Sequence, residues 1–319
     1  MTGEVSFTIY TKGERIRASF KRKYNIFPGK TGTGKSYIWK VISRALKEDD
    51  RSAQLKSDVP LYLVNSINDL EKACTGGKPE GICVLDEPEG ISERELAELT
   101  LKAPHYYMII TRESIEAIPY SVHSVFELKL HKGRNADNLT ATELYSFDTR
   151  IDFEPKIIIT EDSNSGYQFF KHVFKDAEVI SANGKSNISR LLNTLIVQGK
   201  TDILVVADGA AFGSNVKALF ETLSQANVYD AARVCIYLPE SFEWLVLSSD
   251  IFRKFNLKDK LEHTENYAES TIYKSWETYY TELLVDLSRQ YNHVYRKSKL
   301  SEFYLSQSDK IIQVARRDM

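Results

Sequence analysis

The chain has few of the residues that cross-link small proteins or bind structural metals: three cysteines and six histidines among 319 residues. Cys74, Cys83 and Cys235 are too few and too widely spaced for a disulfide framework, and they fit a reducing compartment. The histidines form no HxH or CxxC cluster, which argues against a structural zinc site. No apolar run is long enough to span a bilayer, so we expect a cytoplasmic protein without a membrane partner.

An excess of basic charge is also missing. The 42 Lys and Arg residues against 44 Asp and Glu give a net charge of −2 and a pI of about 6.4. A nucleic-acid partner would therefore have to be held by a local patch. Arg15 and Arg17, with Lys21, Arg22 and Lys23, form a basic cluster near the start of the chain, for which a solvated hairpin face is the favoured explanation.

Length and patterning favour two α/β domains, which we place at residues 1–150 and 151–319. The first opens with an alternating hairpin pattern, VSFTIYTKGERIRASF. In the second, the short apolar runs KIIIT, AEVISA, DILVVAD and RVCIYL alternate with helical patterns, as in a parallel sheet covered on both faces. A helical tail follows, and we assign its aromatic-rich stripe between residues 269 and 296 to core or partner packing rather than to nucleic-acid stacking.

The stretch GKTGTGKS matches the phosphate-binding loop GxxxxGK[ST] in full, between a predicted strand and a predicted helix. Its residues are Gly29, Lys30, Thr31, Gly32, Thr33, Gly34, Lys35 and Ser36. Such glycines let backbone N–H groups turn toward phosphate oxygens, and the start of a helix favours an anion. We expect Lys35 to reach the β- and γ-phosphates of ATP and Ser36 to ligate Mg²⁺.

A second ATPase motif follows at the end of the strand ICVLDE, in Asp86 and Glu87. In its resemblance to P-loop ATPases, Asp86 is the Walker B aspartate that holds Mg²⁺, and Glu87 is the catalytic glutamate that polarises the attacking water. By the same resemblance Thr111, at the end of the next strand, is a polar sensor of the γ-phosphate. For Arg112, a phosphate contact and an exposed ion pair stay open as equal alternatives.

The hairpin before the loop strand adds a resemblance to the ABC-type ATPases of the SMC, RecF and OLD groups. No LSGGQ-like signature lies between the two motifs, and only 50 residues separate Ser36 from Asp86, too few for the usual helical subdomain. The resemblance implies nucleotide binding, and the departure puts ABC-style dimer hydrolysis in doubt.

The order of elements after residue 156 resembles the TOPRIM fold, which carries a glutamate after its first strand and a DxD pair after its third. Glu161 stands at the first position, with Asp162 beside it, and Asp208 stands at the first acid of the pair. Gly213 falls where that family has a glycine, but Ala210 replaces the second acid. The resemblance implies that Glu161 and Asp208 are catalytic metal ligands.

A metal site can also be argued from these residues alone. The ends of parallel strands converge on one crevice, and carboxylates gathered there repel one another unless a cation lies between them. Mg²⁺ suits such oxygens and can activate water for phosphodiester cleavage. Glu240 and Glu243, taken as one helical turn apart, offer a third donor, with Glu240 preferred because it lies nearer the strand end. Lys185 is either a phosphate contact or a solvated loop lysine. Taken singly, Glu161 and Asp208 would be helix N-caps; taken together they favour a site.

Taken as a whole, the chain resembles the OLD-type ATPase–nucleases, many of which act in bacterial defence against phage. The implied fold is α/β: a reduced, ABC-like P-loop ATPase domain without the signature helical subdomain, then a TOPRIM-like parallel βα domain with C-terminal helices. The implied function is ATP-controlled, Mg²⁺-dependent cleavage of DNA or RNA, with a protein partner or a homo-oligomer. Two alternatives stay open: a nucleotide-switched binding module whose TOPRIM-like domain has lost catalysis, and a plain NTPase or kinase, the latter disfavoured by Glu87.

Overall fold

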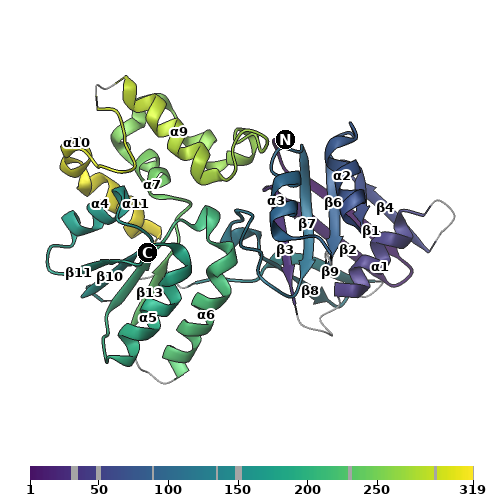
Figure 1. Cartoon of the computed structure of the whole chain (residues 1–319), viewed down its shortest axis with the longest axis horizontal. Coiled ribbons are helices and arrows are strands. Elements are labelled where there is room, and N and C mark those ends of the chain that lie inside the picture. Colours follow the sequence, from purple (N-terminus) through teal and green to yellow (C-terminus); the bar gives the residue numbers. More distant parts are fainter. Residues whose placement is uncertain are drawn as a thin grey trace. The chain divides into compact units, whose positions relative to one another are not determined.

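The computed structural model describes residues 1–29, 35–47, 52–87, 90–133, 136–147, 153–228, 232–290 and 293–318 (Figure 1). The chain divides into two compact units: Met1–Tyr145 with Glu265–Lys274, and Ser146–Thr264 with Ser275–Met319. Each unit contains a four-stranded parallel sheet, which confirms the predicted α/β class. Within the described ranges, no helix combines the length and the apolar character needed to cross a bilayer.

Five strands of the first unit form a mixed sheet in the order β4-β1-β2-β9-β8. They are β1 (Val5–Thr11), β2 (Glu14–Phe20), β4 (Ala53–Ser57), β8 (Phe126–His131) and β9 (Asp137–Glu143). β1 and β2 are the predicted hairpin, antiparallel from Val5 opposite Phe20 to Tyr10 opposite Arg15. Only the β2–β9 pair is parallel among the pairings of this sheet. Because side chains alternate along a strand, one face of this sheet enters the hydrophobic core and the other points away from it.

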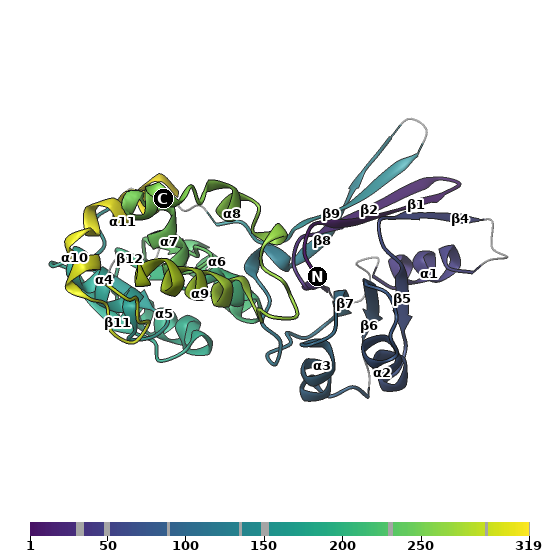
Figure 2. The same cartoon turned by 90° about the horizontal axis from the view of Figure 1, so that it is seen from above.

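The other four strands of the first unit form a parallel sheet in the order β3-β7-β6-β5. They are β3 (Tyr24–Pro28), β5 (Leu61–Val64), β6 (Gly81–Asp86) and β7 (His105–Thr111). The helices are α1 (Lys35–Ala45), α2 (Ile67–Thr75), α3 (Glu93–Thr100) and the single turn η1 (Val122–Ser124). Ser92 caps α3 as predicted, in a capping box with Glu95. α1 buries Ile38, Val41 and Ile42 in a core shared by both sheets, and Figure 2 shows it between them.

A segment from the C-terminal half of the chain, Glu265–Lys274, belongs to the first unit, and we call it the strap. The N–H of Gly3 donates to the carbonyl of Glu265 at 2.6 Å. The ammonium group of Lys23, which burial leaves with a pKa lowered to about 8, donates to the carbonyl of Ser270 at 3.1 Å. The sequence-based boundary assigns the strap to the second domain, because a local sequence pattern does not show that a segment packs against a unit far back in the chain.

The second unit is built on a parallel sheet in the order β11-β10-β12-β13. Its strands are β10 (Ile157–Thr160), β11 (Glu178–Ser181), β12 (Ile203–Val206) and β13 (Val234–Tyr237), the four predicted from the sequence. The connecting helices are α4 (Ser165–Val173), α5 (Ile188–Val197) and α6 (Gly213–Val228), with the turns η2 (Lys185–Asn187) and η3 (Gly209–Ala211). Right-handed crossovers place α4 on one face of the sheet and α5 and α6 on the other, where Figure 1 shows them side by side.

The remaining helices follow β13 in the chain. They are α7 (Phe242–Ser248), η4 (Asp250–Phe255), α8 (Lys258–Glu262), η5 (Thr264–Asn266), α9 (Trp276–Arg289), α10 (Glu302–Ser306) and α11 (Ser308–Asp318). α9 buries Tyr279, Tyr280 and Leu284, so the packing interpretation of the stripe is right for this helix. The predicted helical stripe is longer than the helix, because Ile272 and Val294 lie outside α9, where both are exposed.

Asp202 forms ion pairs at the start of the strands of the second sheet. Its buried carboxylate pairs with Lys156 at 2.8 Å and with Arg233 at 2.5 Å. The hydrogen bond from Lys156, followed by that from Arg233, holds the pKa of Asp202 below its ordinary value. The residues that precede β10, β12 and β13 are thereby joined by one carboxylate.

Candidate functional site

The phosphate-loop motif lies at the carboxyl end of β3. This strand ends at Pro28, and the next N–H, that of Gly29, donates to the carbonyl of Thr111 at 3.2 Å. α1 begins at Lys35. Several predicted phosphate contacts fall outside the described residues: Lys30, Thr31, Gly32, Thr33, Gly34 and the side chains of Lys35 and Ser36. The described part has the strand and the helix in the order that the motif requires.

The strand order brings the second ATPase motif to the same edge. β7 lies between β3 and β6, so Thr111 lies between Gly29 and Asp86, at the carboxyl ends of three parallel strands. The hydroxyl of Thr111 donates to the carbonyl of Glu113 at 3.0 Å and accepts from its N–H. Thr111 is therefore placed as predicted, with its hydroxyl engaged in a local turn.

Glu87 directly follows β6 in a left-handed backbone conformation, with φ at +41°. Its N–H donates to the carbonyl of Ile110 at 2.8 Å, and its carboxylate pairs with Nε of Arg112 at 3.1 Å. A non-glycine residue in this region of φ is uncommon and points to a constrained position. Of the two alternatives for Arg112, the structure has the ion pair.

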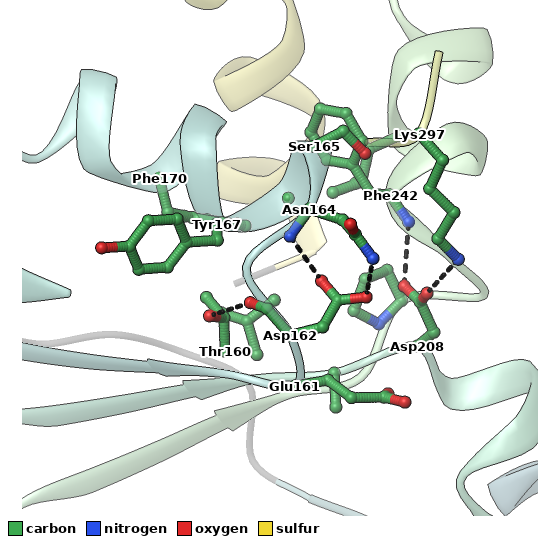
Figure 3. A pocket seen from close by; sticks show the side chains of 15 residues that line it. Thr160, Glu161, Asp162, Asn164, Ser165, Tyr167, Phe170, Asp208, Phe242 and Lys297 are labelled. Atoms are coloured by element: carbon green, nitrogen blue, oxygen red, sulfur yellow. Dashed lines mark hydrogen bonds and ion pairs between the residues drawn. The ribbon is translucent and has the colours of Figure 1, made fainter. Parts of the chain in front are cut away.

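The second candidate site lies at the carboxyl edge of the second sheet. Thr160 and Val206 are opposite each other in the parallel register, so the residues that follow, Glu161 and Asp208, lie at one edge as predicted. Both line a small pocket with a cavity volume of about 40 Å³, drawn in Figure 3. Its walls also include Phe242 and Lys297. This volume is enough for an ion or a few waters.

Asp208 is held by contacts to both of its carboxylate oxygens. Oδ1 accepts the N–H of Phe242 at 3.0 Å, and Oδ2 lies 3.6 Å from Nζ of Lys297. The same ammonium group pairs with Glu277, in the first turn of α9, at 2.5 Å. Figure 3 shows Lys297 reaching down to Asp208 from the opposite wall. One lysine therefore joins two acids from distant parts of the chain.

The charges around Asp208 do not balance. Burial raises its pKa well above the ordinary value, and Glu277, Glu243 and Glu161 add to that rise, while Lys297 offsets only part of it. Burial likewise raises the pKa of Glu161, followed by the effect of Glu277. Burial alone would lower the pKa of Lys297, but Asp208, Glu243 and Glu277 outweigh it and raise it. We call these four acids, Asp208, Glu161, Glu243 and Glu277, the acidic cluster.

A buried hydrogen-bond chain supports one side of the acidic cluster. The hydroxyl of Tyr295 donates to Oε1 of Glu243 at 2.7 Å and lies 2.6 Å from Oγ of Ser165. All three residues are buried, and the other carboxylate oxygen of Glu243, Oε2, is buried without a hydrogen-bond partner among the described residues. The N–H of Ser165 also donates to the carbonyl of Lys297 at 2.9 Å. The chain thus fixes both Glu243 and the backbone of Lys297.

Glu243 lies in the first turn of α7, and its charge contributes to the raised pKa of Asp208 after burial and Glu277. α7 begins at Phe242, so Glu240 precedes the helix and the two glutamates do not share a helical face. The carbonyl of Glu240 accepts the N–H of Ala210 at 3.1 Å. The shared helical face is therefore wrong, while the preference for Glu240 as the third donor stays a prediction.

Three other predicted residues lie close by in different roles. Asp162 turns toward Asn164, whose N–H it accepts at 2.9 Å, while Glu161 points the other way in Figure 3. Lys185 donates to the carbonyl of Ala211 at 2.7 Å, and its charge lowers the pKa of Glu161. Ala210 is buried and does not line the pocket.

Neither Glu161 nor Asp208 caps the helix that follows its own strand. The N-cap of α4 is Asn164, and Glu161 makes no cap contact there. Asp208 makes no side-chain cap for the turn η3 that it precedes. It instead accepts the first N–H of α7, from Phe242, so this carboxylate stabilises the start of a helix distant in sequence.

In its chemistry, the acidic cluster fits a hard cation. Carboxylates are preferred ligands of Mg²⁺. Burial, followed by neighbouring acids, raises the pKa values of Asp208 and Glu161. No described residue donates a hydrogen bond to the buried Oε2 of Glu243. In the described part of the chain, however, no three His, Cys, Asp or Glu side chains are placed to hold one metal ion. A cation would need Asp208 to exchange its contact with Lys297.

Sequence reasoning did not identify Glu277, Tyr295 or Lys297. Ser275 and Glu277, in the stretch SWETYY, carry the signal of a helix start, and Ser275 indeed caps α9. Nothing in the pattern YRKSKL distinguishes Lys297 from its basic neighbours. These residues reach the site because the helical tail packs beside it. Because only residues that follow strands were candidates from the sequence, these three were not predicted.

No known protein family matches the chain, and no curated protein or solved structure matches it either. The roles of the residues are therefore inferred from the two sites themselves.

Proposed function

We propose that this protein binds ATP in its first unit and cleaves phosphodiester bonds of DNA or RNA in its second unit, with Mg²⁺ as cofactor and under nucleotide control. The observation that carries the proposal is that Glu161 and Asp208, at the ends of two neighbouring strands, line one small pocket, with Lys297 in its wall. On this proposal the protein is an OLD-type ATPase–nuclease that acts in bacterial defence against phage, with a protein partner or a second copy of the chain.

The ATP-binding half rests on the motif and its neighbours. GKTGTGKS lies between β3 and α1, and Asp86 and Thr111 lie at the same sheet edge as Gly29. Lys35 would contact the phosphates, and Ser36 and Asp86 would hold the nucleotide's Mg²⁺. Glu87 would orient the attacking water after releasing Arg112.

In the second unit, Glu161 and Asp208 would hold the ion, with water molecules as its other ligands. When bound, Mg²⁺ would supply a Lewis acid that activates water and stabilises the leaving oxygen. Lys297 would then exchange its contact with Asp208 for a phosphate oxygen, and Tyr295 would keep Glu243 in place.

The strap offers a covalent route for nucleotide control. Lys23, one residue before β3, bonds the strap at Ser270, and the strap runs directly into α9. Glu277 in the first turn of α9 pairs with Lys297. A shift of β3 on ATP binding would therefore be transmitted to the acidic cluster along the seven residues 271–277.

Cleavage of plasmid DNA and of tRNA tests the proposal. We expect cleavage with Mg²⁺ and ATP, and a loss of about 100-fold or more in Glu161→Gln and Asp208→Asn, a magnitude typical of removing a positioned catalytic group. Asp162→Asn is the matched control, because it removes a carboxylate that faces Asn164. Lys35→Ala should remove the ATP dependence, with the exposed Lys40→Ala as its control on the same helix. Cleavage that survives both acidic-cluster variants, or that is absent with every divalent metal, contradicts the proposal.

A second candidate is a nucleotide-switched binding module whose second unit holds a partner protein without cleaving nucleic acid. The contact between Lys297 and Asp208 favours it, because a lysine there supplies the positive charge that a metal would otherwise bring. Titration calorimetry with Mg²⁺ in the absence of ATP separates the two candidates. Metal binding that disappears in Asp208→Asn supports the nuclease; no metal binding, with a partner retained only with ATP, supports the module.

A further inference from the structure

Among the described residues, one face of the mixed sheet of the first unit lies outside the hydrophobic core of that unit. Phe7, Ile9, Ile16 and Ala18 point into the core. The alternate residues point away from α1, on the side of the sheet that is open within this unit in Figure 2. Such a face is ordinarily polar and solvated. Here its composition is strongly biased toward one sign of charge.

Strand pairing gathers basic residues from three separate parts of the chain onto this face. One row across the five strands reads Lys56, Thr8, Arg17, Thr140, Lys129. The next row reads Gln54, Tyr10, Arg15, Asn138, His131. We call Arg15, Arg17, Lys56 and Lys129 the basic face; all four are exposed.

Among the described residues, Lys129 alone of these cations has an acidic partner. Glu127 lies 3.1 Å from Lys129. For Arg15, Arg17 and Lys56, no carboxylate among the described residues lies within ion-pairing distance. The whole chain carries a net charge of −2, so the basic face is a local concentration of charge opposite in sign to the total. Uncompensated cations held close together repel one another and favour an anionic partner.

An aromatic ring holds two of the cations in place. The guanidinium carbon of Arg15 and Nζ of Lys56 lie 5.5 and 5.4 Å from the centre of the Tyr10 ring. Cation–π contacts of this length fix long side chains that would otherwise sample many rotamers. The charges of Arg15 and Lys56 are therefore partly ordered before any partner arrives.

We propose that the basic face binds the sugar–phosphate backbone of a nucleic acid. Neighbouring strands lie about 4.8 Å apart, so the cations on β4, β2 and β8 are separated by about 10 Å, and the two rows by about 7 Å. That spread is too wide for one phosphate and suits a polymer with a phosphate on every nucleotide. Contacts of this kind are independent of base sequence. The proposal extends the proposed function, because it gives the substrate a site on the first unit, yet binding is measured without cleavage.

Fluorescence anisotropy with a labelled RNA oligonucleotide and full-length protein, in EDTA and without ATP, tests this inference. Each lost phosphate contact lowers the slope of log K against log salt by about 0.7 to 0.9. Arg15→Gln/Arg17→Gln should therefore lower the slope by about 1.4 to 1.8, which is a loss of about 25- to 60-fold in affinity near 0.1 M salt. A DNA duplex of the same sequence should show a similar loss, because no base is contacted.

Lys72→Gln/Lys102→Gln is the matched control, because it removes two exposed cations of the same unit that do not lie on this sheet. It should leave the slope unchanged. Equal losses in the two double variants, or no salt-dependent binding by the wild type, would overturn the proposal. Tighter binding of labelled poly-glutamate than of RNA, lost in Arg15→Gln/Arg17→Gln, would overturn it in favour of an acidic protein partner. Absence of nuclease activity with Mg²⁺ leaves these results unaffected, so the two failures are distinguishable.

Discussion

Tyr295→Phe should destabilise the second unit by much more than the loss of one hydroxyl usually does. The Tyr295 hydroxyl, which is buried, donates to the carboxylate of Glu243 and also contacts the hydroxyl of Ser165. A hydrogen bond to a charged group contributes about 1.5 to 3 kcal/mol, and a neutral one about 0.5 to 1.5 kcal/mol. Because Oε2 of Glu243 already lacks a donor, the variant leaves a buried carboxylate with neither oxygen bonded. We expect the free energy of unfolding to fall by about 2 to 4.5 kcal/mol.

Urea titration followed by tryptophan fluorescence measures this loss. Two of the three tryptophans, Trp244 and Trp276, belong to the second unit, so a Trp39→Phe background reports on that unit alone. Tyr304→Phe is the control: this tyrosine is also fully buried, but its hydroxyl donates at 3.3 Å to a neutral carbonyl. It should lose about 1 kcal/mol. Equal losses in the two variants would refute the assigned role of Tyr295.

Three further predictions concern the same unit. In EDTA, Lys297→Met should raise the already raised pKa of Asp208 further. The melting temperature of the variant should therefore fall increasingly below that of the wild type as the pH rises above 3.8, the ordinary pKa of this carboxyl. A difference in melting temperature that is constant with pH would count against the pairing of Lys297 with Asp208. Asp202→Asn should show the opposite pH dependence. The lowered pKa of Asp202 gives the wild type stability that is present above pH 3.8 and is lost as the pH falls through the pKa of the folded state. The melting temperatures of wild type and variant should therefore converge in acid. Gly209→Ala should cost about 1 to 3 kcal/mol in urea titration, because a Cβ would lie 2.6 Å from one backbone carbonyl and 2.9 Å from the next, that of Pro239; an unchanged midpoint would contradict this.

The sheet of the second unit was predictable because its strands are short, mostly apolar and separated by helical patterns. Once β10 and β12 are neighbours, the register alone brings Glu161 and Asp208 to one edge. The capping role of Ser92 was predictable for a similar local reason, since a capping box is a pattern of four consecutive residues.

The rest of the site depends on contacts that local patterns do not encode. Lys297 reaches Asp208 only because the helical tail folds back over the sheet, and 89 positions separate the two residues. The interpretation that Glu240 and Glu243 share a helical face was wrong because of a helix boundary: Ser241 caps α7, so only the later glutamate lies inside the helix. The strap is a third case, where ten residues join a unit whose other members end at Tyr145.

The strap also delays completion of the first unit while the chain is being synthesised. A ribosome that has released Tyr145 must add a further 129 residues, through Lys274, before the first unit has all of its parts. At about 5 to 20 residues per second, this takes about 6 to 26 s. During that interval Lys23 and the N–H of Gly3 lack their strap partners, while most of the second sheet has already emerged. We expect the two units to complete together, near the end of translation, rather than one after the other.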